Sequence, residues 1–343
     1  MGGGAGMNGF GGQAGAADIG GVAGTTSAGA AGAGGTSAGG AGGGPAPRIV
    51  AEYPLPTANA SPQGIVRGPG GLLWFVEGNA SKIGAIGVSG AVQEFAALGA
   101  YTSLAAGPDG NIWYTDFFGD AIDRLTPAGV VSMFPLPSNS PAPLPTTSAG
   151  LAAIAAGPDG NLWFTEQKRV KIGRVTPGGT ITEFDLLAES VFPFAIAAGP
   201  NETLWFTDGG ANFIGRLTTD GAIASFPIPT ANAGGGDICL GPDGNMWFIE
   251  DLAHKIARVS PDGRVVEFAL PDSASPSAIT TGPDGNLWFT DPLANKVGRM
   301  TLDGDVLELT APTANASPND IVAGFDGNLW FTEANAGIGV VAP

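Results

Sequence analysis

The stretch GPDGNLWFTE, from Gly157 to Glu166, decides the fold because close copies of it recur along most of the chain. All the tryptophans of the sequence belong to these copies. They are Trp74, Trp113, Trp163, Trp205, Trp247, Trp288 and Trp330, separated by 39, 50, 42, 42, 41 and 42 residues. Internal periods of this length are typical of repeat architectures, in which every unit is one small structural module.

Each unit contains four short runs of strand-forming residues. In the third unit these runs are AIAAG, LWFTE, KIGRV and ITEF, and the turns PDGN and TPGG lie among them. Aromatic and β-branched residues fill the runs, whereas Gly, Pro, Asn and Asp gather at the joints. Four-stranded units of about 42 residues, repeated radially, are typical of β-propeller blades. We therefore predict an all-β, seven-bladed β-propeller.

The two ends of the repeat array predict how the ring closes. The last unit stops at GIGVVAP (337–343) without a fourth strand, while a spare copy of that strand, IVAEYPLP (49–56), precedes the first unit. We expect this N-terminal strand to complete the last blade, which removes the open edges that invite aggregation. The Pro-rich insertion at 135–150 lies in the one long interval between tryptophans, and we expect a loop there.

The N-terminal segment differs in composition from the repeats. Residues 1–46 consist mainly of Gly, Ala, Ser and Thr and have no apolar periodicity, so we predict a disordered tether ahead of a propeller at 47–343. No intact signal peptide and no transmembrane run is visible. Spacers of this kind nevertheless follow export signals, and we expect an extracellular, periplasmic or cell-surface protein.

The net charge of the chain, its single cysteine and its single histidine argue against several kinds of function. The chain has 14 basic and 31 acidic residues, which argues against a nucleic-acid partner because phosphate binding needs clustered Lys and Arg. Cys239 is the single cysteine, so an intrachain disulfide is excluded, and we expect a buried, inert thiol. His254, the single histidine, occupies a turn position, where we expect a solvated side chain. We expect a monomer.

Residues repeated in every blade are interpreted as scaffold. An acidic residue ends the second strand of each unit, and five units carry an arginine in the third strand. Simple antiparallel pairing places Arg174 opposite Trp163, close enough for cation–π attraction. The acidic positions are Glu77, Asp116, Glu166, Asp208, Glu250, Asp291 and Glu333.

Function is expected where the repeats differ, at the start of each first strand, which faces the central mouth. Around the ring this position holds Gln63, Thr102, Ala152, Phe194, Gly236, Ser277 and Asn319, none of which titrates near neutral pH. The next residue is small in most blades. Asp237 and Asp320 are the carboxylates that break this pattern.

The motifs GPDGNLWFTE, KIGRVTPGGTITEFDL (171–186) and FPIPTANAGG (226–235) resemble the repeats of the virginiamycin B lyase, or streptogramin B lyase, family of seven-bladed propellers. The resemblance covers about residues 47–343. It implies a magnesium-dependent lyase that linearises a cyclic depsipeptide antibiotic by elimination, and hence antibiotic resistance at the level of the family.

The family's general base and a companion histidine lie in PH dipeptides that open the first strands of the last two blades. Here those dipeptides are PS, with Ser277, and PN, with Asn319. The family's mouth tyrosine corresponds to Gln63, and its metal-binding acid to Ala334, one residue after Glu333. Loss of a positioned base typically costs about 10² to 10⁴ in rate, and neither Ser nor Asn replaces imidazole at neutral pH.

We therefore favour an exported module that binds a small molecule, peptide or glycan at the mouth without the family's elimination chemistry. One alternative is a magnesium-dependent lyase in which Asp320 substitutes for the base. Another is a surface module that only mediates protein contacts. The candidate ligand contacts are Gln63, Phe194, Ser277, Asn319 and Asp320, and the candidate metal contacts are Glu333 and Asp237.

Overall fold

A computed structural model describes residues 46–343 except 98–100, 118, 138–148, 187–191 and 272–273. The predicted tether, apart from its last residue, and most of the 135–150 insertion lie outside the described residues, as do the side chains of Tyr101 and Thr102. Among the residues described, no helix has the length and hydropathy needed to cross a membrane.

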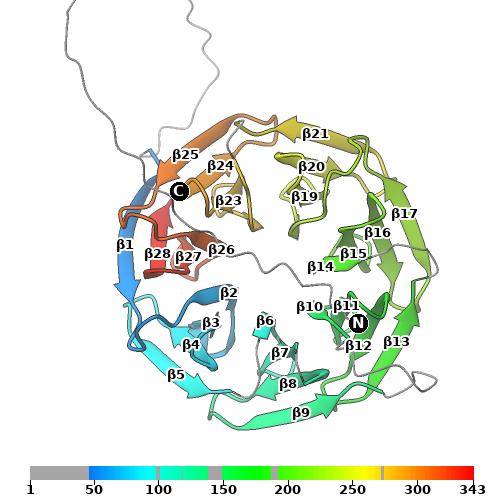
Figure 1. Ribbon diagram of the computed structural model, residues 1–343, viewed down its shortest axis with the longest axis horizontal. Helices are drawn as coiled ribbons and strands as arrows, with labels where there is room; N and C mark the ends of the chain where they lie inside the picture. Colours follow the sequence, from blue (N-terminus) through cyan, green and yellow to red (C-terminus); the bar gives the residue numbers. More distant parts are fainter. Residues whose placement is uncertain (1–45, 98–100, 118, 138–148, 187–191, 272–273) are drawn as a thin grey trace, which may run out of the picture. The chain divides into compact units, whose positions relative to one another are not determined.

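The described residues form seven four-stranded antiparallel sheets around a central axis (Figure 1), as the sequence predicts. We number the sheets as blades 1 to 7 in chain order of their inner strands. From the inside outward, blades 1 to 3 are β2 (Pro62–Arg67), β3 (Leu73–Glu77), β4 (Lys82–Ile86), β5 (Val92–Ala96); β6 (Tyr101–Ala106), β7 (Ile112–Asp116), β8 (Ala121–Leu125), β9 (Val131–Pro135); and β10 (Leu151–Ala156), β11 (Leu162–Glu166), β12 (Lys171–Val175), β13 (Ile181–Asp185).

Blades 4 to 7 follow the same order. They are β14 (Pro193–Ala198), β15 (Thr203–Asp208), β16 (Phe213–Thr218), β17 (Ile223–Pro227); β18 (Ile238–Leu240), β19 (Met246–Glu250), β20 (Lys255–Val259), β21 (Val265–Ala269); β22 (Ile279–Thr281), β23 (Leu287–Asp291), β24 (Lys296–Met300), β25 (Val306–Thr310); and β26 (Pro318–Ala323), β27 (Leu329–Glu333), β28 (Gly337–Ala342), β1 (Arg48–Pro54). A short 3₁₀ turn, η1 (Pro69–Gly71), precedes β3.

The N-terminal strand closes the ring, which confirms the prediction. β1 runs antiparallel to β28, with Arg48 opposite Ala342 and Pro54 opposite Gly337. Tyr53 of β1 stacks on Trp330 of β27, with ring centroids 5.6 Å apart. Inner strands of successive blades contact each other, and β2 contacts β26, so the circuit is complete.

The apolar core lies between neighbouring blades. Trp163 is fully buried and stacks on Phe184 of its own blade at 5.3 Å, while it packs with Leu204 and Phe206 of the next blade. The Arg174 guanidinium lies 5.5 Å from the Trp163 ring, and the two residues are paired across β11 and β12. The predicted cation–π pair is therefore confirmed.

The turn GPDGN has a second role besides reversing the chain. Asp159 Oδ1 accepts a hydrogen bond from Trp163 Nε1 at 3.0 Å, and Asp159 Oδ2 accepts one from Asn161 Nδ2 at 2.7 Å. Gly160 has a φ of +72°, in the left-handed region that favours glycine. The motif thus fixes the turn and the buried tryptophan together.

The single histidine and the single cysteine of the sequence differ in how well the structure matches the prediction. His254 is exposed with a φ of +53°, and the predicted turn histidine is confirmed. Cys239 on β18 is half-buried rather than fully buried, so that prediction was wrong in degree, and its side chain packs against the core between blades 5 and 6. Burial of the thiol raises the pKa of Cys239, which keeps it protonated and unreactive.

Candidate functional site

Five of the seven inner strands carry β-bulges at their starts, and these bulges shape the mouth. In β14 the register shifts between Pro193 and Ile196, and equivalent shifts occur in β2, β6, β10 and β26. A bulge adds an unpaired residue and re-aims the side chains beside it. The variable mouth positions, such as Phe194 and Asn319, lie in these irregular segments.

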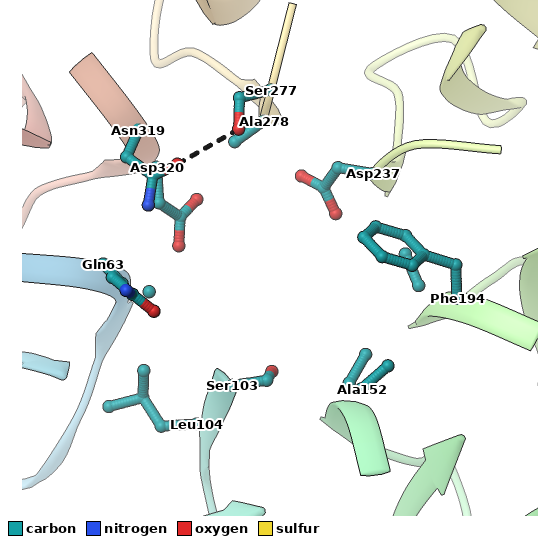
Figure 2. A pocket seen from close by; sticks show the side chains of 13 residues that line it. Gln63, Ser103, Leu104, Ala152, Phe194, Asp237, Ser277, Ala278, Asn319 and Asp320 are labelled. Atoms are coloured by element: carbon teal, nitrogen blue, oxygen red, sulfur yellow. Dashed lines mark hydrogen bonds between the residues drawn. The ribbon is translucent and has the colours of Figure 1, made fainter. Parts of the chain in front are cut away.

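A cavity of about 240 Å³ opens at this end of the ring (Figure 2). It brings together six of the seven predicted site residues, contributed by blades 1, 4, 5, 6 and 7. These residues are Gln63, Phe194, Asp237, Ser277, Asn319 and Asp320. Glu333 is not among the residues that line the cavity, because it is fully buried in β27, farther from the axis.

Ser277 and Asn319 are bonded to each other across two blades. The Ser277 hydroxyl donates to Asn319 Oδ1 at 3.2 Å, a contact drawn in Figure 2. The backbone carbonyl of Asn319 accepts a further bond from Thr290 Oγ1 at 2.8 Å. A hydroxyl and an amide joined in this way supply no group that accepts a proton near neutral pH.

Asp237 and Asp320 each connect their blade to the next one. Asp320 Oδ2 accepts a hydrogen bond from the Ile65 amide of blade 1 at 2.7 Å, and its Oδ1 accepts one from the Ile321 amide at 2.7 Å. Asp237 Oδ2 accepts one from the Ile279 amide of blade 6 at 2.9 Å. Both residues break the repeat pattern in the sequence, but the sequence does not predict their bonds to the next blade. The amide that bonds to Asp237 lies about 40 residues further along the chain, and the amide that bonds to Asp320 lies near the other end of the chain.

Burial changes the acidity of these two carboxyl groups. Loss of hydration raises the pKa of Asp237 to about 6, although the amides of Ile279 and Ile238 oppose the shift. Burial, followed by repulsion from Asp237, raises the pKa of Asp320 to about 7, against the effect of the amides of Ile65 and Ile321. The cavity therefore exchanges protons between about pH 6 and 7.

The opposite wall of the cavity is apolar. Phe194 is 45% exposed and its ring points into the cavity beside Asp237 (Figure 2). Leu104 and Ala152 continue this wall around the mouth. An exposed aromatic ring in the same cavity as two half-buried carboxyl groups suits a ligand that has both an apolar and a hydrogen-bond-donating part.

The mouth residues do not fit the magnesium ion that the family resemblance implies. Mg²⁺ needs a near-octahedral set of oxygen ligands. The mouth offers two carboxyl groups, Asp237 and Asp320, which lie on different blades, and its other polar side chains include Ser277 and Asn319, which are bonded to each other. Across the described ranges, no three His, Cys, Asp or Glu side chains are grouped to hold a metal.

Comparison with known proteins identifies the relatives of this ring. The model of the virginiamycin B lyase family matches residues 46–150 and 142–342. A streptogramin B lyase structure is 33% identical over 86% of this chain and 97% of that chain, with a TM-score of 0.79.

Virginiamycin B lyase from Staphylococcus aureus is 32% identical over 87% of this chain and 100% of its own, with a TM-score of 0.79. A catalytically inactive form of that lyase, solved with quinupristin, gives the same values. No curated protein matches the sequence.

Proposed function

Since the chain belongs to the virginiamycin B lyase family, yet carries neither of the histidines expected at its mouth, we propose that it binds a ligand there without performing an elimination reaction. The observation that carries this proposal is the Ser277–Asn319 hydrogen bond. It joins the two positions where a proton acceptor would be needed, and it leaves a polar, non-basic surface.

The chemistry of the cavity favours a peptide-like ligand with an amine or amide group. Asp237 and Asp320 offer carboxyl oxygens that can accept further N–H groups, and Phe194 offers an aromatic surface. The chain's net charge of −17 adds long-range attraction for a cationic ligand. Binding of a basic peptide is expected to weaken as the pH falls through about 7 and then about 6, because Asp320 and then Asp237 take up protons.

The test is a screen of the full chain against arrays of short peptides and oligosaccharides, followed by calorimetric titration of the tightest binder. Phe194→Ala and Asp237→Asn are expected to weaken that binder at least tenfold. Phe325→Ala is the matched control, because Phe325 is also exposed (43%) but follows the far end of β26. Equal affinities in all three variants, or no binder in the screen, would contradict the proposal.

A second candidate function rests on the acidity of Asp320. A carboxyl group whose pKa lies near 7 is poised to act as a general base at neutral pH. If Asp320 abstracts the proton in an elimination, quinupristin, the compound in a related structure, should be linearised. That turnover should rise through about pH 7 and disappear in Asp320→Asn, whereas turnover that survives this substitution excludes the role.

We also propose that the protein acts outside the cytoplasm. The support is the Gly/Ala/Ser-rich composition of residues 1–46. Protease treatment of intact cells that express the native gene should cleave the protein, and full protection would contradict an extracellular location.

A further inference from the structure

Two positions in each blade vary together, one at the start of the third strand and one in the middle of the fourth. In blade 1 they are Lys82 and Glu94, whose side chains form an ion pair at 2.5 Å. The same pair occurs at 2.7, 2.6 and 2.5 Å in blades 3, 5 and 6, as Lys171–Glu183, Lys255–Glu267 and Lys296–Glu308. Blades 2 and 4 have neither member, with Ala121 and Met133, and Phe213 and Ser225.

Blade 7 has the glutamate without the lysine. Glu52 pairs with Gly339 across β1 and β28, just as Glu94 pairs with Gly84 across β5 and β4. The lysine position is Gly337. A Cβ atom there would lie 2.2 Å from the backbone oxygen of Tyr53, so the close approach of the closing strand excludes any side chain.

A threonine completes the arrangement in blades 1, 5 and 7. In blade 1 the backbone amide and hydroxyl of Thr57 donate to the two oxygens of Glu94, and Lys82 Nζ contacts Glu94 Oε2 at 2.5 Å and Thr57 Oγ1 at 2.6 Å. Thr230, Glu267 and Lys255 repeat these contacts in blade 5.

In blade 7 the threonine and the glutamate keep the same geometry. The Thr313 amide donates to Glu52 Oε1 at 3.1 Å, and its hydroxyl donates to Glu52 Oε2 at 2.8 Å. Among the described residues, no Lys or Arg nitrogen lies within 4.0 Å of Glu52 or Glu333. The oxygens that surround an ammonium group in blades 1 and 5 are thus present without that ammonium group.

Glu333 adds a third oxygen donor to this group. Like Glu77, Glu166 and Glu250, it is fully buried and has no hydrogen-bond partner for either carboxyl oxygen. A lysine acts on each of those three residues, whereas the charged group that faces Glu333 is Glu52. As two carboxylates, Glu52 and Glu333 repel each other, and they can share a hydrogen bond only if one keeps a proton. Burial and then Glu52 raise the pKa of Glu333 to about 8. In blade 1, burial and then Glu94 raise the pKa of Glu77 to about 7, while Lys82 acts to lower it.

We propose that Glu52, Glu333 and Thr313 bind a hard divalent cation, Ca²⁺ in the first instance, which replaces the lysine of the other blades. The donors are all oxygens, which suit Ca²⁺ or Mg²⁺ rather than a transition metal. Two carboxylates balance a divalent charge, and Ca²⁺ tolerates irregular geometry and completes its shell with water. None of these three residues lines the mouth cavity, so the proposal does not depend on the function proposed above.

The cation would fasten the closing strand. Glu52 lies on β1, Glu333 on β27, and Thr313 on the segment that leads from blade 6 into β26. A ligand that binds these three segments together in the folded state stabilises that state by mass action. Weak affinity, with a dissociation constant of about 10⁻⁴ to 10⁻³ M, is expected from so few protein ligands.

The test measures calcium binding to the full chain by equilibrium dialysis and by terbium luminescence. A Tb³⁺ ion at this site should be sensitised by Tyr53 and Trp330, which stack on each other in β1 and β27 of the same blade. The wild type is expected to bind one ion, and Glu52→Gln and Glu333→Gln to lose at least tenfold in affinity. Thermal unfolding of both variants in EDTA checks that they fold.

Glu94→Gln is the matched control, because it alters the same position in blade 1, where Lys82 supplies the charge. It should keep the wild-type calcium affinity, as should Asp237→Asn at the mouth. No calcium binding by the wild type, or an equal loss in Glu52→Gln and Glu94→Gln, would overturn the proposal. A pH-dependent stability that calcium leaves unchanged would also overturn it, because a shared proton would then occupy the site.

Discussion

Trp163 and Phe194 illustrate the difference between the scaffold and the mouth of this propeller. Trp163 is fully buried, recurs in every blade, and is held by Phe184, Arg174 and Asp159. Phe194 is 45% exposed, has no counterpart at the mouth position of another blade, and faces the cavity. Repetition in this chain therefore marks residues that build the ring, and departure from the repeat marks residues that line the mouth cavity.

The largest expected effect is on the scaffold side. Trp163→Ala should lower the free energy of unfolding by about 3–5 kcal/mol, because it removes a buried aromatic side chain and leaves a cavity between blades 3 and 4. Urea unfolding followed by circular dichroism measures the change. A loss below about 1 kcal/mol would break the distinction between scaffold and mouth.

The next effect concerns the tight contact between neighbouring strands. A Cβ atom at Gly173 would lie 2.0 Å from the buried Phe164 ring, so Gly173→Ala should cost about 1–3 kcal/mol through overpacking. Gly178→Ala is the control, because the nearest atom to a Cβ there is 3.7 Å away. Equal stability of the two variants would show that the strands can separate without cost.

A smaller effect on stability is expected from Glu333, a scaffold residue that faces Glu52 and has no lysine at the neighbouring position, Gly337. Its pKa in the folded protein, about 8, lies above the ordinary value of 4.5, so the folded state holds an extra proton between these values. The resulting stabilisation is complete below about pH 4.5 and is lost as the pH rises through 8. One proton gives a slope of at most about 1.4 kcal/mol per pH unit.

In EDTA, the free energy of unfolding should therefore fall more steeply with pH in the wild type than in Glu333→Gln. Denaturant titrations at pH 5, 6, 7 and 8 give the two slopes. Identical slopes would mean that Glu333 is ionised in the fold at all these pH values.

The smallest effect on stability is expected at the mouth. Phe194→Ala should change the free energy of unfolding by less than about 0.5 kcal/mol, because nearly half of Phe194 is exposed and it is not among the buried core residues. The same variant should lose ligand affinity, as measured by calorimetry. A large loss of stability would place Phe194 with the scaffold instead.

The repeat predicts most of the fold because the repeat itself is the folding unit. The position of each tryptophan gives the number of blades, and the spare strand at residues 49–56 predicts the closure seen between β1 and β28. Antiparallel pairing also predicts the Trp163–Arg174 contact. These features depend on short-range register, which the spacing of residues determines.

The mouth could be predicted only in part. The sequence identifies the side chains that face the centre, because they precede each first strand at a fixed distance. It does not show that Asp320 bonds to the amide of Ile65, or that Glu333 faces Glu52 rather than the cavity. Both contacts join the two ends of the chain, and they depend on ring closure rather than on local pattern.

The most direct test of the central claim is to incubate the wild-type protein with magnesium and a streptogramin B depsipeptide and to examine the product by tandem mass spectrometry. The linear product has the same mass as the ring, and fragmentation distinguishes the two. With Ser277 and Asn319 bonded to each other in place of a histidine base, we predict that the ring stays intact. Ring opening that EDTA abolishes and that Asp320→Asn removes would contradict the account.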